Sequence, residues 1–272
     1  MPATLPPPAT HPAGPPPAAG PPGVASFVEL DGEGMVAIES RRLLAGPIRV
    51  GGPRGTVTVP ETAADLDGFR QWTLSDEFPD NARIDFLAGR IFVDLSMQRH
   101  QAHALPKTEI VRVLANRLVE NPLGELASDV TRVYLPDGGA SFEPDVVLVS
   151  FEAIESGRVT ETAAKDGSDG VEFVGPPELV VEIVSPSSVG KDTVELPAGC
   201  YAGGVAEYWL VDCRDDAAEE VGFLIHARGE AVFAAVEPDA DGFAASPTLG
   251  KAYRLSRQRG RLGRWTYRLE ER

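Results

Sequence analysis

One acidic residue inside an apolar strand is the feature that most constrains this chain. The run Leu179–Val184 is bounded by Pro-Pro and Ser-Pro, and its β-branched residues predict a short buried strand. Glu182 stands in the middle of it. Burying an unpaired charge costs on the order of tens of kcal/mol by Born estimates, so this carboxyl group must protonate, pair with a cation or bind a metal.

The composition indicates a globular protein of one large or two small domains. The chain has 272 residues, of which 43% are hydrophobic and 24% charged. No apolar run approaches the roughly 20 residues that a membrane helix needs, and we expect neither a membrane contact nor a secretory signal. Cys200 and Cys213 are too few for a disulfide framework and lack metal-ligand spacing, so a cytoplasmic location is expected.

The charge is strongly negative but unevenly distributed. A net charge of −16 argues against broad non-specific attraction to nucleic acid. Residues 251–272, however, carry eight basic and two acidic side chains. This basic segment either reaches phosphates or pairs with the acidic surface of the protein itself, and we favour self-pairing.

The chain divides into four predicted regions. Residues 1–24 are almost entirely Pro, Ala and Gly, which predicts a disordered tail. Short β-like pieces over 25–65 predict an N-terminal β extension, 66–255 form the principal domain, and 256–272 are the basic C-terminal segment.

The principal domain mixes strands with few helices. A hairpin is predicted over 83–95 around Ala88-Gly89, and the clearest helix covers 106–121, where Ile110, Val113 and Leu114 share one face. The insertion 156–175 is expected to form a small hairpin or a mobile loop. The other predicted elements are a short helix over 61–74, strands over 127–135, 143–150, 207–212, 222–227 and 231–237, and a weak helix over 191–200 interrupted by Pro197 and Gly199. We therefore expect an α/β or α+β fold with one central mixed β-sheet flanked by helices.

Two further carboxylates accompany Glu182. Asp145 begins an apolar strand directly after Pro144, and Glu109 lies beside the buried face of the clearest helix. Three acids on rigid elements offer the hard oxygen ligands that a divalent cation requires. Such a cation would polarise a phosphoryl oxygen and lower the pKa of a bound water.

Each of these acids also has a structural explanation. Glu182 could pair with a buried Arg112 or Arg132. Asp145 could cap a turn after Pro144, and Glu109 could interact with the helix dipole. These alternatives stay open on the residues alone, and His103 is expected to be a surface or capping histidine.

A set of motifs resembles the Uma-two-like family of restriction-endonuclease relatives in the PD-(D/E)XK superfamily. The resemblance runs from about Leu66 to Leu269, and its motifs are DEFP, IDFLAGRIFVDLSM, H-x3-KTEI, EPD, LVVEIVSPSS, KD, GVAEYWLVD and SPTLGKAYRLSRQRGRLGRW. It implies a restriction-endonuclease-like core, a mixed sheet with a helix on each side, within 66–255. It also implies hydrolysis of DNA phosphodiester bonds with Mg²⁺ or Mn²⁺, and is compatible with a homodimer.

The resemblance assigns roles to individual residues. It makes Asp145 and Glu182 the metal-binding acids and Glu109 the acid of the core helix, and Asp85 matches an acid of the early hairpin. The chain departs from the superfamily at Val184, where E-x-K has lysine. Lys191 could swing back to orient water or neutralise charge, or it could be an ordinary loop lysine.

Two hypotheses about function follow from these residues. The first is an active metal-dependent nuclease, in which Asp145 and Glu182 hold the metal, Glu109 supports them and Lys191 is the positive group. The second is a catalytically degenerate nuclease-fold protein that acts as a binding or interaction module. The net charge and the missing E-x-K lysine favour the second, whereas the acid in a buried strand favours the first.

Overall fold

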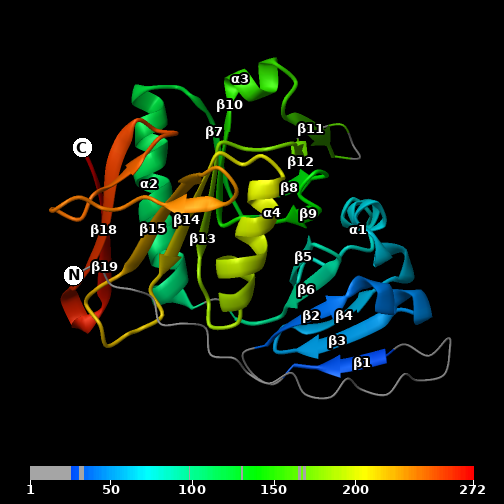
Figure 1. Cartoon of the computed structure of the whole chain (residues 1–272). Helices are drawn as coiled ribbons and strands as arrows, with labels where there is room; N and C mark the ends of the chain where they lie inside the picture. Colours follow the sequence, from blue (N-terminus) through cyan, green and yellow to red (C-terminus); the bar gives the residue numbers. More distant parts are fainter. Residues whose placement is uncertain (1–25, 31–33, 98, 130, 165–166, 168–169) are drawn as a thin grey trace. The chain divides into compact units, whose positions relative to one another are not determined.

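The computed structural model describes residues 26–30, 34–97, 99–129, 131–164, 167 and 170–272 (Figure 1). Two compact units divide this part of the chain: one combines the residues up to 83 with 89–97, and the other combines 84–88 with 98–272. The tail predicted to be disordered over 1–24 lies outside the described residues. The four region boundaries drawn from the sequence stay a prediction.

The first unit contains short strands and one short helix. Strands β1 (Ser26–Glu29), β3 (Ile48–Gly52) and β4 (Gly55–Val59) form a three-stranded sheet, and β2 (Met35–Glu39) pairs with β6 (Arg90–Asp94). Helix α1 (Leu66–Thr73) begins where the Asp65 carboxylate accepts a hydrogen bond of 2.8 Å from the Gly68 N–H. Phe69 and Trp72 are its buried residues. The β pieces and the helix predicted for this stretch therefore form.

The second unit is organised around a six-stranded sheet in the order β16-β15-β14-β13-β10-β7. The β13–β14 pair is parallel and its neighbours are antiparallel, so the sheet is mixed, and the predicted mixed α/β class is confirmed. The strands are β7 (Gly124–Ser128), β10 (Val146–Ser150), β13 (Leu179–Ile183), β14 (Glu207–Asp212), β15 (Gly222–Arg228) and β16 (Phe233–Ala235).

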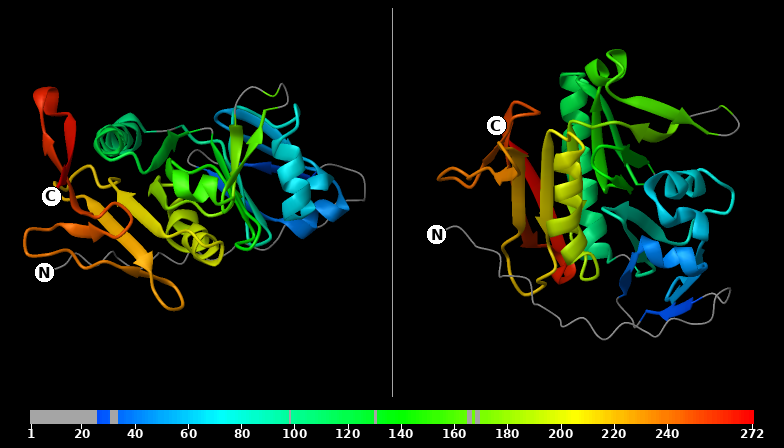
Figure 2. Two further views of the ribbon diagram at one scale, coloured as in Figure 1. Left: turned by 90° about the horizontal axis from the view of Figure 1, so that it is seen from above. Right: turned by 45° about the vertical axis from the view of Figure 1, so that its right-hand side comes forward.

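Helices cover both faces of this sheet (Figures 1 and 2). Helix α2 (Leu105–Glu120) packs Ile110 and Leu114 into the cluster that contains Val181 and Trp209. Side chains alternate along a strand, so Tyr208 faces the other way. There its hydroxyl donates a hydrogen bond of 2.8 Å to the carbonyl of Asp192, in the helical turn η4 (Lys191–Glu195) that leads into α4 (Leu196–Ala202).

A second group of strands in this unit has the order β11-β12-β8-β9-β5. It comprises β5 (Arg83–Leu87), β8 (Arg132–Leu135), β9 (Ala140–Phe142), β11 (Thr160–Ala163) and β12 (Gly170–Val174), with the short helix α3 (Phe151–Glu155) after β10. The insertion 156–175 forms the antiparallel pair β11–β12, so the hairpin alternative holds for its described residues. Ala88 and Gly89 both have positive φ, as the tight turn predicted after β5 requires.

The predicted interruption of the helix at Pro197 and Gly199 is wrong. Pro197 lies in the first turn of α4, where no N–H is required. Gly199 meets the β8–β9 turn so closely that a Cβ on Gly138 would lie 2.3 Å from the Gly199 carbonyl oxygen. The glycines therefore permit a close helix–turn contact that local propensity cannot reveal.

The basic C-terminal segment is a β structure whose arginines pair with acids of the same chain. Strands β17 (Ala244–Ser246), β18 (Lys251–Arg259) and β19 (Trp265–Glu271) form an antiparallel sheet. Arg254 binds Glu270 at 2.7 Å, and Arg272 binds Asp239 and Asp241. The self-pairing alternative thus describes these arginines. Among the described residues, no helix combines the length and the hydropathy that crossing a bilayer requires.

Replacing Gly138 by alanine should lower the free energy of unfolding by about 1–3 kcal/mol, because the new Cβ meets the backbone of α4. Gly190 is the matched control: it is helical and exposed, and a Cβ added to it would have no atom within 4 Å. Gly190→Ala should leave stability unchanged or raise it by about 0.5 kcal/mol. Denaturant unfolding of both variants measures the difference, and equal stabilities would contradict the close contact.

Candidate functional site

Asp145 lies where the ladder between β10 and β13 ends. The last pair is Val146 with Val181, and continuing this register brings Pro144 opposite Ile183. Proline has no N–H to donate to the Ile183 carbonyl, so the ladder does not continue past Val146. The Ile183 N–H instead donates a hydrogen bond of 2.7 Å to the Asp145 carboxylate, which is fully buried. The Pro-Asp sequence therefore ends the strand pair and fixes the aspartate against β13.

Glu182 precedes Ile183, whose N–H binds Asp145, and continuing the register by one residue past its last pair brings Glu182 opposite Asp145. Such positions have Cβ atoms about 5 Å apart. Burial, reinforced by the charges of Glu182, Asp192 and Asp145, raises the pKa of the Tyr208 hydroxyl well above its ordinary value. The three carboxylates therefore surround the side of the sheet that faces α4.

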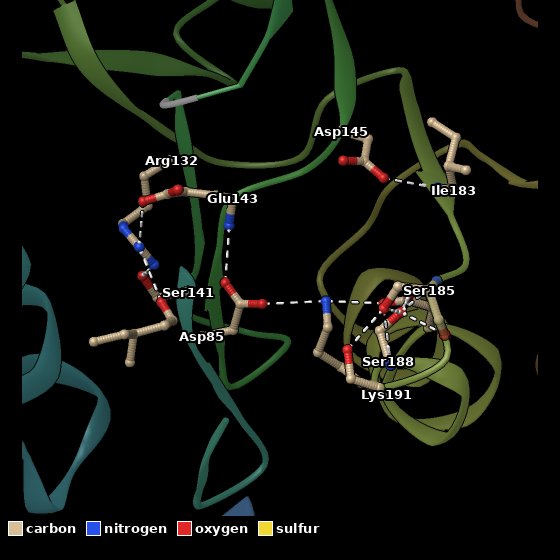
Figure 3. A network of polar contacts seen from close by, with 12 residues as sticks. Asp85, Arg132, Ser141, Glu143, Asp145, Ile183, Ser185, Ser188 and Lys191 are labelled. Carbon is tan, nitrogen blue, oxygen red and sulfur yellow. Dashed lines mark hydrogen bonds and ion pairs between the residues drawn. The ribbon is translucent and has the colours of Figure 1, made fainter. Parts of the chain in front are cut away.

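Lys191 reaches this cluster from the turn that precedes α4. Its ammonium lies 3.1 Å from the Asp85 carboxylate and 2.9 Å from that of Asp192, and its side chain is only 3% exposed. Figure 3 shows Lys191 and Asp85 directed toward each other across the cluster. Lys191 is thus a buried ion-pair partner rather than an ordinary loop lysine. It comes nine residues after Glu182, whereas the lysine of the E-x-K motif would stand at the position of Val184.

A buried arginine holds the segment that carries Asp145. Arg132 on β8 contacts the Glu143 carboxylate at 2.7 Å and the Ile84 carbonyl at 3.0 Å. The Glu143 N–H in turn donates to Asp85 at 3.1 Å (Figure 3). Of the two arginines considered as partners of Glu182, Arg132 therefore contacts Glu143, and Arg112 binds Glu109.

Two basic residues of the site were not identified from the sequence. His103 Nε2 lies 3.2 Å from one Asp145 oxygen, and Lys107 Nζ lies 3.6 Å from the other. His103 is buried, so its expected surface or capping role is wrong. Residues four apart on a helix share a face, and the H-x3-K spacing was the signal that could have identified the pair.

Glu109 is not brought to this cluster, contrary to the prediction. It lies two residues beyond Lys107, about 200° around the helix axis. Its carboxylate accepts two hydrogen bonds of 2.8 Å from Arg112 and one of 3.0 Å from the Leu269 N–H on β19. Burial raises the pKa of Glu109, but these hydrogen bonds outweigh it and hold the pKa below its ordinary value.

The arrangement suits a cation held by two acids rather than by three. Within the described part of the chain, no group of three or more His, Cys, Asp and Glu side chains has the geometry of a metal site. Mg²⁺ commonly binds one or two carboxylates and takes its other ligands from water and substrate phosphates. Asp145 and Glu182 supply such a pair of hard oxygen donors on adjacent strands. The donor chemistry therefore fits, whereas a three-acid cage that includes Glu109 does not.

Comparisons with known proteins identify a family and similar solved structures. A family model described as Uma2, "Putative restriction endonuclease", matches residues 66–247. A solved structure from Anabaena variabilis, described as "a putative nuclease belonging to DUF820", is 20% identical over 68% of this chain and 90% of that chain, with a TM-score of 0.49. A search of curated proteins found no match.

Glu109→Gln should lower the free energy of unfolding by about 1 kcal/mol at neutral pH, because the Leu269 N–H and Arg112 lose a charged acceptor. The folded-state pKa of Glu109 is lowered, so its contribution is present above the ordinary value of 4.5 and is lost as the pH falls through the folded-state value. The difference between wild type and variant should therefore disappear in acid. Urea unfolding across this pH range measures it, and a constant difference would contradict this assignment.

Proposed function

Because the chain belongs to the Uma2 family, we propose that it is a metal-dependent endonuclease that hydrolyses phosphodiester bonds of DNA. One observation carries the proposal: the Ile183 N–H fixes the buried Asp145 beside β13, the strand that carries the buried Glu182, and Lys191 is buried among neighbouring carboxylates. The pair of acids and the lysine are the groups that such a hydrolysis needs.

Asp145 and Glu182 would hold Mg²⁺ or Mn²⁺, which supplies a polarised phosphoryl oxygen and a more acidic bound water. The chain contributes the position of these acids. The Ile183 N–H fixes one oxygen of Asp145, and His103 contacts the same oxygen. Both contacts orient the carboxylate before substrate arrives, so little reorganisation is needed when it binds.

Lys191 is the positive group of the proposed site. Asp85 and Asp192 hold its ammonium in a buried position, where a charge interacts more strongly than in water. From there it would orient the attacking water or stabilise the charge that develops on the phosphate. Asp85 is a positioning residue in this scheme, and the Glu143 N–H fixes it.

A second candidate function is binding without hydrolysis. Val184 in place of lysine favours it, and so does the net charge of −16. A cytoplasmic location and a homodimer both stay predictions. The two candidate functions differ in turnover, which single substitutions in the site can measure.

Asp145→Asn, Glu182→Gln and Lys191→Met should each reduce Mg²⁺-dependent cleavage of plasmid DNA by at least about 100-fold, the usual effect of removing a group that stabilises the transition state. Asparagine keeps an oxygen for the Ile183 N–H, so Asp145→Asn tests charge rather than folding. Glu109→Gln is the matched control and should cleave as wild type does. Cleavage by Asp145→Asn at the wild-type rate would refute the assignment.

Mn²⁺ should raise the melting temperature of the wild-type protein and of Glu109→Gln. A concentration about 100 times the dissociation constant contributes about 2.7 kcal/mol, which corresponds to a shift of about 5–10 °C in a chain of this size. Asp145→Asn and Glu182→Gln should lose most of this shift, measured by differential scanning fluorimetry. A shift retained in both variants would place the cation elsewhere.

A further inference from the structure

Lys107 stands between a buried and an exposed carboxylate. Its ammonium lies 2.6 Å from Asp129 and 3.6 Å from Asp145, and its own side chain is 10% exposed. Asp145 is fully buried, whereas the Asp129 side chain is 54% exposed. The closer partner of Lys107 is therefore the one that solvent reaches.

The two lysines of the site differ in how readily they can exchange partners. Lys191 pairs with Asp85 and Asp192, which are both buried, and breaking a buried pair costs several kcal/mol. In the pair between Lys107 and Asp129 only the Asp129 side chain is exposed, so water can solvate this carboxylate when Lys107 leaves it. Lys107 can therefore leave Asp129 for another anion at small cost.

Lys107 is also close to the place where a phosphate would have to bind. Its contact with Asp145 keeps the ammonium beside the proposed metal-binding acid. A DNA phosphate, like a carboxylate, accepts hydrogen bonds from an ammonium group through negatively charged oxygens. The carboxylate of Asp129 would occupy the position of this phosphate and, as an anion near the site, would repel DNA.

We propose that Lys107 binds a DNA phosphate beside Asp145, and that Asp129 holds this lysine when DNA is absent. Asp129 is thus an autoinhibitory partner that the substrate phosphate displaces. The inference rests on the proposed function and extends it. Lys107 provides affinity for the DNA backbone, whereas Lys191 orients the attacking water or stabilises the charge that develops on the phosphate.

A double-mutant cycle tests the exchange. Anisotropy of a fluorescein-labelled DNA duplex, in EDTA so that no cleavage occurs, measures affinity for wild type, Lys107→Gln, Asp129→Asn and the double variant. Asp129→Asn should bind DNA about three- to tenfold more tightly, because Lys107 no longer has to break an ion pair before it binds the phosphate. This factor corresponds to about 1 kcal/mol of binding free energy. Lys107→Gln should bind more weakly and should lower the slope of log K against log salt by about 1.

A control variant separates the effect of losing the Lys107–Asp129 ion pair from the effect of losing one negative charge. Asp137→Asn removes the same charge from an exposed residue of the β8–β9 turn and should change affinity little. In the Lys107→Gln background, Asp129→Asn should have no more effect than Asp137→Asn. An equal gain with and without Lys107, an unchanged salt slope, or no DNA binding by any variant overturns the inference. Coupled binding without cleavage in Mg²⁺ overturns only the proposed function.

Discussion

The hydrogen bond from the Ile183 N–H to Asp145 is the interaction on which the site depends. The ladder between β10 and β13 ends at Val146 and Val181, and an unpaired buried N–H at Ile183 would cost about 1–3 kcal/mol. The carboxylate that takes this N–H is thereby held at one point beside β13. The same register, continued by one residue, brings Glu182 opposite Asp145, and a slip of one residue would turn the apolar side chains to the wrong face.

This geometry concentrates negative charge in a buried place. Asp85, Asp145, Glu182 and Asp192 are all at most 2% exposed, and two lysines enter among them. The lysines come from different helical segments, Lys191 from the turn before α4 and Lys107 from α2. If all the carboxylates are ionised, the lysines leave an excess of negative charge that favours a cation. A cation bound there, as proposed, would explain how Glu182 can stand in the middle of an apolar strand.

The sequence predicted the parts of the site that local pattern controls. The strand around Glu182, the strand after Asp145 and the helix that carries Glu109 all have unambiguous patterns, and all three form. Glu109 does lie beside the apolar face of α2, but it meets β19, which comes some 160 residues later in the chain. No local pattern indicates which strand a helix face will meet. His103 and Lys107 show the same limit. Their spacing in the sequence indicates a shared helix face, but it does not indicate that this face contacts Asp145.

The fold of the C-terminal segment engages several of its arginines within the chain. Its basic residues suggested a reach toward phosphates, but Arg254 and Arg272 bind acids of the same chain, and Arg257 donates to the Cys213 and Ala218 carbonyls. A chain with a net charge of −16 gains little from long-range attraction to a polyanion. The phosphate contacts of the proposed site would then be short-range, made by cations beside the acids proposed to hold the metal. Lys107 occupies such a position, because it is the lysine whose carboxylate partner lies at the surface.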